Sequence, residues 1–168
     1  MSSILRAVVV SFALGCATTG PAETFDQYWE AYGAGDADTL WELSSPSARA
    51  DARRVQQEIL NGLESPDLEQ RTFWEGQFGT TPEEIRALSE RGFFVWAIGT
   101  IRKRLGSGAI RSVVSRIARV KEESLGADGV VIVYRTGEEI SRLPFIRTPE
   151  GWRVDQSPFP PAQTAPPP

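Results

Sequence analysis

Residues 129–155, GVVIVYRTGEEISRLPFIRTPEGWRVD, decide the fold of this chain. Residues 129–135 are rich in β-branched side chains and lie between turn-forming pairs, which predicts a strand. Residues 140–148 predict a second strand, in which Pro144 favours an edge or a bulge because proline cannot donate a ladder hydrogen bond. Residues 151–155 alternate in polarity and predict a third strand, so this region is expected to form an antiparallel meander.

The segment before the meander leaves two structures open. Residues 112–122 carry apolar side chains at helical spacing, but their position directly ahead of the first strand favours another strand. The sheet is therefore expected to have three or four strands.

The first residues of the domain show a helical pattern. Four aromatic side chains share one face at i, i+3, i+4 and i+7, namely Phe25, Tyr28, Trp29 and Tyr32. Thr24 and Gln27 fit a capping box at the start of this helix, and Gly33 supplies its stop. Asp36 can cap a second, shorter helix.

The middle of the chain, residues 46–105, is expected to be an enlarged helical segment. Ser45-Pro46 and Ser65-Pro66 each fit an N-cap followed by proline at the first helical position. Thr81-Pro82-Glu83-Glu84 adds a capping-box glutamate to the same pattern.

Together these segments predict one α+β domain over residues 22–156, in which N-terminal helices pack on a curved antiparallel sheet. After Ser157, six of the last eleven residues are proline. This composition predicts an extended, unpacked tail over residues 157–168.

The composition excludes several kinds of chemistry. The chain has no histidine, which removes imidazole metal sites and Ser-His-Asp triads. Cys16 is the single cysteine, so an intrachain disulfide and a cysteine-rich metal site are excluded. The net charge of −4 gives no electrostatic reason to bind nucleic acid. We expect no metal and no cofactor.

Residues 1–15 have the features of a signal peptide. Arg6 precedes the uncharged residues 7–15, which are too short to cross a hydrocarbon core of about 30 Å. Residues 13–16, Ala-Leu-Gly-Cys, resemble the lipobox of bacterial lipoproteins. The resemblance implies cleavage before Cys16, a diacylglycerol thioether on its sulfur and acylation of its new amino group.

The lipobox resemblance also implies an address. Residues 16–21 would be the lipidated cysteine and a flexible linker, and the bilayer would be a partner of the chain. Ala17, in place of aspartate after the cysteine, favours the outer membrane of the cell envelope, with the domain facing the periplasm.

Residues 22–44 and 111–156 together resemble the nuclear transport factor 2-like superfamily, a cone-shaped α+β fold. The similar features are the aromatic first helix, the Gly35-Asp36 step into the second helix and the closing Gly151-Trp152 strand. The resemblance implies a curved sheet that wraps the helices and leaves a cavity for an apolar or amphipathic ligand. The candidate residues for lining this cavity are Trp29, Tyr32, Trp41, Phe94, Trp96, Tyr134, Leu143 and Phe145.

Charged residues leave further alternatives. Asp155 and Arg142, with Arg153 nearby, form either a polar site inside the cone or a cross-strand ion pair on the outer face. Seven of the 18 basic residues lie within residues 102–121. They face anionic lipid headgroups or an acidic partner, or else they face the acidic block at residues 17–48.

Three functions follow from these observations. The first is a non-enzymatic, membrane-anchored extracytoplasmic lipoprotein that binds a small hydrophobic ligand or an envelope protein, which an enclosed pocket would support. The second is an assembly lipoprotein that docks through residues 46–105, which a filled cone with exposed apolar helices would support. The third is a lyase, isomerase or cyclase that uses a carboxylate, which a dry carboxylate or tyrosine bonded to another titratable group would support.

Overall fold

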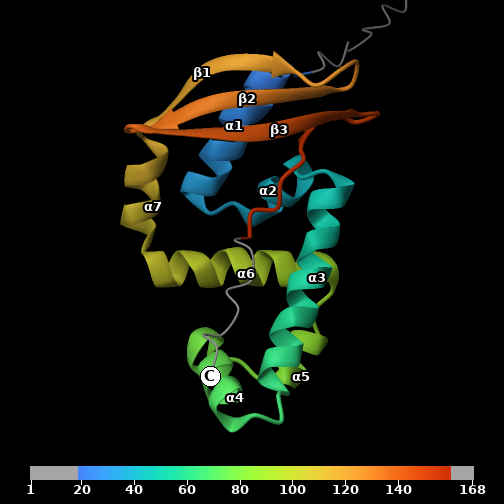
Figure 1. Ribbon diagram of the computed structural model, residues 1–168, viewed down its shortest axis with the longest axis vertical. Helices are drawn as coiled ribbons and strands as arrows, with labels where there is room; N and C mark the ends of the chain where they lie inside the picture. The colour runs from blue at the N-terminus through green and yellow to red at the C-terminus, as the bar shows by residue number, and fades with distance from the viewer. Residues whose placement is uncertain (1–18, 160–168) are drawn as a thin grey trace, which may run out of the picture.

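The computed structural model describes residues 19–159, and these residues form an α+β fold of seven helices followed by four strands (Figure 1), which confirms the predicted fold class. The helices are α1 (Pro21–Ala34), α2 (Ala37–Leu43), α3 (Pro46–Leu63), α4 (Leu68–Phe78), α5 (Pro82–Arg86), α6 (Glu90–Leu105) and α7 (Ser107–Val114). The strands are β1 (Ile117–Ser124), β2 (Gly129–Thr136), β3 (Glu139–Thr148) and β4 (Gly151–Val154). The expected signal peptide and Cys16 lie outside the described residues.

The strands form one antiparallel sheet in the order β1-β2-β3-β4. β2 and β3 pair along their whole length, from Gly129 opposite Ile146 to Thr136 opposite Glu139. Residues 112–122 contain both expected alternatives in succession, because the last turn of α7 is followed at once by β1. The meander therefore has four strands.

Pro144 lies where the β3–β4 ladder stops. β4 pairs with β3 only from Phe145 to Thr148, and the N–H of Asp155 donates to the Pro144 carbonyl at 2.9 Å. Because the nitrogen and carbonyl of one strand residue point to the same side, the Pro144 nitrogen faces the end of this ladder. Pro144 therefore lies at an edge only on the β4 side of β3. On the other side, β3 pairs with β2.

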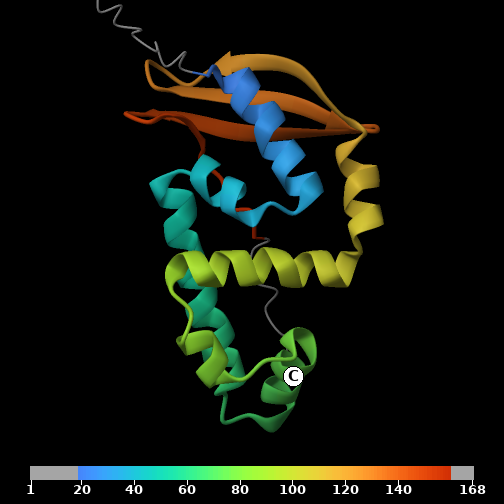
Figure 2. The ribbon, with the colours of Figure 1, turned by 180° about the vertical axis from the view of Figure 1, so that it is seen from behind.

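Helices cover one face of the sheet, which we call the inner face, and the core lies there. α1 crosses this face (Figure 2). Phe25 of α1 packs against Phe145 of β3 and Tyr134 of β2, with ring centroids 6.5 and 5.5 Å apart. Ile132 and Leu143 belong to the same buried cluster. Burial of each such side chain stabilises the fold by about 1.5–3 kcal/mol.

The opposite, outer face of the sheet has no helix on it in the described part of the chain (Figures 1 and 2). The register places Val131 and Val133 of β2 there, between Lys121 and Glu123 of β1 and Arg142 of β3. Both valines are nevertheless only 6% and 3% exposed. Glu123 pairs with Lys121 at 2.7 Å and also pairs with Arg142, so charged side chains close over the apolar centre of the strand.

Two predicted helix starts are wrong. α1 begins at Pro21, and Thr24 lies inside the helix, where its hydroxyl donates to a carbonyl one turn earlier. Proline at the first helical position explains this earlier start. α4 begins at Leu68 rather than after Ser65, because the Asp67 carboxylate accepts the free N–H groups of its first turn.

The predicted end of α1, at Gly33, is two residues too early. The helix continues through Gly33, which packs against Val114 of α7, where an added Cβ would meet a methyl carbon at 3.3 Å. It ends at Gly35, whose φ of 81° places it in the left-handed region that glycine adopts without strain.

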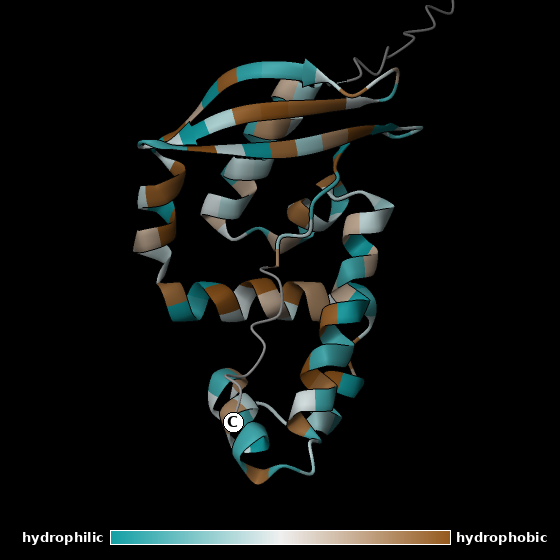
Figure 3. Ribbon diagram, viewed as in Figure 1, coloured by the Kyte–Doolittle hydropathy of each residue, from teal (hydrophilic) through white to brown (hydrophobic). Residues whose placement is uncertain are grey.

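The enlarged helical segment contains an arm that extends away from the sheet, which we define as α3, α4 and α5, the helical arm (Figure 1). The α3 cap at Ser45 and the capping box of Thr81 and Glu84 are present as predicted. α4 has no buried residue. Its Trp74 lies over Gly62 of α3, where an added Cβ would be 2.4 Å from the indole. Polar and apolar residues alternate along α3 and α4 (Figure 3).

The core reaches beyond residue 156, the expected end of the domain. Phe159 is 7% exposed and packs against Phe93 and Phe94 of α6, with ring centroids 6.3 and 5.4 Å apart. Residues 157–159 therefore belong to the packed body, and the rest of the expected tail lies outside the described residues.

Candidate functional site

The eight expected cavity residues belong to one core cluster or pack against it. Trp29, Tyr32, Tyr134, Leu143 and Phe145 lie between α1 and the sheet, Trp41 packs on Phe94, and Trp96 packs on Phe78 and Phe93. Phe94, Leu143 and Phe145 are 0%, 3% and 0% exposed. The other five, Trp29, Tyr32, Trp41, Trp96 and Tyr134, are partly buried and pack against the same core.

Trp29 is at the centre of the group under the sheet. Its ring lies 5.4 Å from Tyr134 and 5.6 Å from Tyr32. Its Nε1 is buried and has no hydrogen-bond partner among the described residues. Burial raises the pKa of Tyr28, Tyr32 and Tyr134, so these phenols stay protonated at neutral pH and cannot act there as bases.

Arg142 and Asp155, expected to form a polar group, have separate partners. Arg142 pairs with Glu123 of β1 on the outer face. Asp155 follows β4 and accepts hydrogen bonds from the hydroxyls of Ser45, at 2.6 Å, and Ser47. An outer-face ion pair is therefore present at Arg142, with a different carboxylate from the expected one.

Ser45 is the residue at this junction that sequence analysis missed. It is 0% exposed, and its hydroxyl accepts the Ala48 N–H at 3.0 Å while donating to Asp155. Its own N–H donates to the Val154 carbonyl at 2.8 Å. The Ser45-Pro46 pair signalled a helix start, but no local pattern connects it with a residue 110 positions away.

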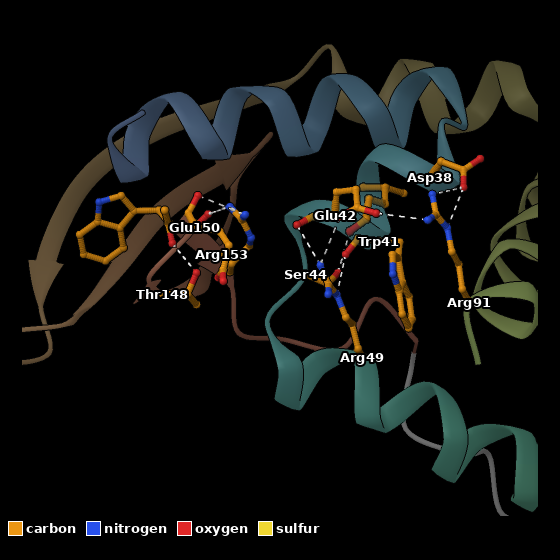
Figure 4. A network of polar contacts seen from close by, with 12 residues as sticks. Asp38, Trp41, Glu42, Ser44, Arg49, Arg91, Thr148, Glu150 and Arg153 are labelled. Atoms are coloured by element: carbon orange, nitrogen blue, oxygen red, sulfur yellow. Dashed lines mark hydrogen bonds and ion pairs between the residues drawn. The ribbon is translucent and has the colours of Figure 1, made fainter. Parts of the chain in front are cut away.

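A second polar network lies beside this junction (Figure 4). Arg49 lies over the Trp41 ring, 5.0 Å from its centroid, and donates to the carbonyls of Trp41 and Glu42 at 2.9 and 3.1 Å. Arg91 of α6 pairs with Asp38 at 2.8 Å and with Glu42 at 3.4 Å. The network ties α2 to α3 and to α6.

Glu150, in the turn between β3 and β4, is the acidic group on the other side of Figure 4. A hydrogen bond from Thr148, and then the charges of Arg153 and Arg49, lower the pKa of its carboxyl. The carboxylate is therefore ionised at neutral pH.

A groove of about 300 Å³ lies on the helical arm, between α3, α5 and the start of α6. It is lined by Arg53, Gln56, Gln57, Leu60, Arg86, Leu88 and Glu90. The Gln56 amide donates to the Ile85 and Leu88 carbonyls at 2.8 and 3.2 Å, and Arg53 pairs with Glu90 at 3.0 Å. Arg86 pairs with Glu64 and Glu83 outside the groove, and none of the eight expected cavity residues lines it.

The basic residues 102–121 are divided between two environments. Arg119 pairs with Asp26 of α1 at 3.3 Å, as expected if this segment faces the acidic N-terminal block. Four exposed cations form no ion pair with another described residue, namely Lys103, Arg104, Arg111 and Arg116. We call Lys103, Arg104 and Arg111 the α6–α7 corner. The segment therefore contains both a compensated part and a free cationic surface.

Within residues 19–159, no three aspartate or glutamate side chains gather closely enough to hold a metal ion. No helix in that range is long and apolar enough to cross a membrane. In the comparisons with known proteins, no family model, curated protein or solved structure matches the chain. Its function therefore has to be argued from the geometry of its own residues.

Proposed function

We propose that this protein is a non-enzymatic lipoprotein of the bacterial cell envelope, anchored to a bilayer through acylated Cys16, that binds a protein partner through its helical arm. The observation that carries the proposal is that α4 has no buried residue although it stands at the end of the arm. Ordering a helix costs conformational entropy, and α4 recovers little of it by burial within this chain.

α4 carries apolar side chains that its contacts within the described residues do not fully cover. Leu68 is 66% exposed, and Phe73, Trp74 and Phe78 are only partly buried. Trp74 and Phe78 stack with centroids 5.6 Å apart. Partly exposed aromatic side chains are enriched at protein–protein contacts, where they contribute large apolar areas at low entropy cost.

The contact between α3 and α4 is incompletely satisfied. The Nε1 of Trp74, which packs over Gly62 of α3, is buried without a hydrogen-bond partner among the described residues. A buried unpaired polar atom costs about 1–3 kcal/mol, so α4 is held less firmly than its packing alone would give. A weakly held helix can adjust its position when a partner binds.

The other expected functions receive less support. The aromatic set that would line a ligand cavity is packed together, and the groove on the arm is polar. The tyrosines under the sheet stay protonated, and Asp155 is held by two serine hydroxyls. The described residues therefore support docking through the arm better than ligand binding or proton transfer.

The anchor is tested on protein purified from native membranes, by mass spectrometry of its N-terminal peptide. We expect the chain to begin at Cys16 and to carry the mass of a diacylglycerol thioether and an amide-linked acyl chain. A chain that retains residues 1–15, or a free thiol at Cys16, would contradict the anchor.

The arm is tested by placing a photoreactive amino acid at Leu68 in intact cells. The matched control is Ile140 of β3, which is similarly exposed at 58% against 66%. We expect a protein adduct of one discrete mass from position 68 and none from position 140. A stoichiometric small apolar molecule in the purified protein, with no adduct at position 68, would favour ligand binding instead.

A further inference from the structure

The outer face of the sheet has a net positive charge, whereas the whole chain has a net negative charge. Because side chains alternate along a strand, the paired positions place four cations on this face: Lys121, Arg135, Arg142 and Arg153. Glu123 is the one carboxylate among the paired outer-face positions of the described strands. The chain as a whole has a net charge of −4, so positive charge is concentrated on this face.

Apolar groups lie among these cations. Ile140, opposite Arg135, is 58% exposed. Val131 and Val133 lie beneath the charged side chains of the neighbouring strands. Long cationic side chains around apolar groups are suited to the boundary between lipid headgroups and acyl chains.

The tether would hold this face close to a bilayer. Cys16 lies five residues before Pro21, a span of at most about 18 Å when fully extended. The beginning of α1 is fixed to the sheet, since Asp26 pairs with Arg119 of β1 at 3.3 Å. The helical arm extends from the other side of the molecule (Figure 1).

We propose that the outer face of the sheet lies on an anionic lipid surface and so directs the helical arm away from the bilayer. This inference rests on the proposed acylation of Cys16, which keeps the sheet within reach of the headgroups. Each cation near an anionic membrane strengthens the contact roughly fivefold. The sheet would thus serve as the membrane-facing side of the protein, and the arm would be free to meet its partner.

The α6–α7 corner is the competing cationic surface. Lys103, Arg104 and Arg111 are exposed there beside Leu105, which is 59% exposed. Lys103 and Arg104 lie in the last turn of α6, at the end of α7 that is away from the sheet, whereas α1 begins beside the sheet (Figure 1). The tether thus favours the outer face, and the corner supplies a control of equal charge.

The orientation is tested on the acylated chain purified from membranes and placed in nanodiscs of phosphatidylcholine, with or without one part in three of phosphatidylglycerol. A fluorophore is attached to Ile140→Cys, Leu68→Cys or Leu105→Cys, and the discs carry a headgroup quencher. We expect strong quenching at position 140 in the anionic discs, its reversal by 0.5 M salt, and little quenching at position 68. Stronger quenching at position 105 or 68, or none at 140, would overturn the inference.

Two matched double variants test the outer face and the α6–α7 corner separately. Arg135→Gln with Arg142→Gln removes two charges from the outer face, and Lys103→Gln with Arg104→Gln removes two from the corner. The ratio of docked to undocked protein is expected to fall roughly 25-fold for the first pair and to stay within about twofold for the second. An equal loss for both pairs would show attraction by net charge alone and would overturn the inference.

A chain without acyl chains would not be retained by the discs, which would contradict the proposed anchor rather than the cationic face. In that case the same two variants are compared by co-sedimentation with free vesicles of the two compositions. Equal sedimentation of both variants would then overturn the inference, and a selective loss for the outer-face pair would support the face as a lipid-binding surface without the tether.

Discussion

The sheet with its covering helices and the helical arm are built from similar residues but differ in how those residues are used. Phe25, Phe94 and Phe145 are at most 2% exposed in the body, whereas α4, with three aromatic residues of its own, has no buried residue. In the body the aromatic side chains form a closed core, whereas in the arm they are partly exposed to solvent. The body therefore has a closed apolar core, whereas the apolar side chains of α4 are only partly covered within the described residues.

The largest effect is expected where the body is most closely packed. Phe145→Ala removes a fully buried ring that contacts Phe25 and should lower the free energy of unfolding by about 3–5 kcal/mol. The measurement is equilibrium denaturation by urea, with tryptophan fluorescence as the signal. A loss below about 1 kcal/mol would contradict the distinction between body and arm.

Two glycines of the arm make a matched pair with opposite expected effects. Gly62→Ala places a Cβ against the indole of Trp74 and should destabilise the α3–α4 contact by about 1–3 kcal/mol. Gly76→Ala, where a Cβ meets nothing within 4 Å, should stabilise α4 by up to about 1 kcal/mol. Hydrogen exchange over residues 68–78 should rise for the first variant and fall for the second, with the sheet unchanged. A change of the same sign in both would mean that the indole does not limit the packing of α4.

A smaller effect is expected at Ser45, which connects the arm to the body. Ser45→Ala removes the α3 cap and one hydrogen bond to Asp155, which should cost about 1–2 kcal/mol. Ser47→Ala leaves the cap in place and should cost less. Thermal unfolding of the two variants compares them directly, and an equal loss would assign the effect to Asp155 rather than to the cap.

The smallest effect is a pH dependence confined to α5. Hydrogen bonds from the Thr81 N–H and the Thr80 hydroxyl lower the pKa of Glu84. Because its pKa is lowered in the folded state, its stabilisation is present above the ordinary glutamate pKa and is lost as pH falls through the folded value. Amide exchange of residues 82–86, corrected for the intrinsic rate, should therefore gain protection as pH rises through this range. Glu84→Gln should remove this dependence, and an unchanged profile would contradict the capping role.

Local sequence patterns predicted much of the fold, because strands and capped helices are determined by neighbouring residues. The meander and the starts of α3 and α5 followed from such patterns. The start of α1 was misplaced because Thr24 fits a cap as well as an interior helical position, and a proline three residues earlier was decisive. Gly33 fits a stop equally well in sequence, and only its contact with Val114 shows why it lies inside the helix.

The polar junctions could not be predicted from the sequence. Asp155 was expected to meet Arg142, but its partners come from the start of α3, and this pairing depends on how the whole chain returns on itself. The eight aromatic and aliphatic residues expected to line a cavity belong to the core cluster or pack against it. Whether such residues line a cavity or fill it depends on side-chain volumes across three elements, which no periodicity reports.

The position of Phe159 bears on how the chain tolerates trimming from its C-terminal end. A carboxypeptidase that removes residues one at a time should leave the fold intact until it reaches this ring, which is wedged on α6. Loss of the ring would then uncover Phe93 and Phe94 at once. The stability of the shortened chain should thus fall abruptly when residue 159 is removed. A tag fused after this residue would be attached to a segment that packs on α6.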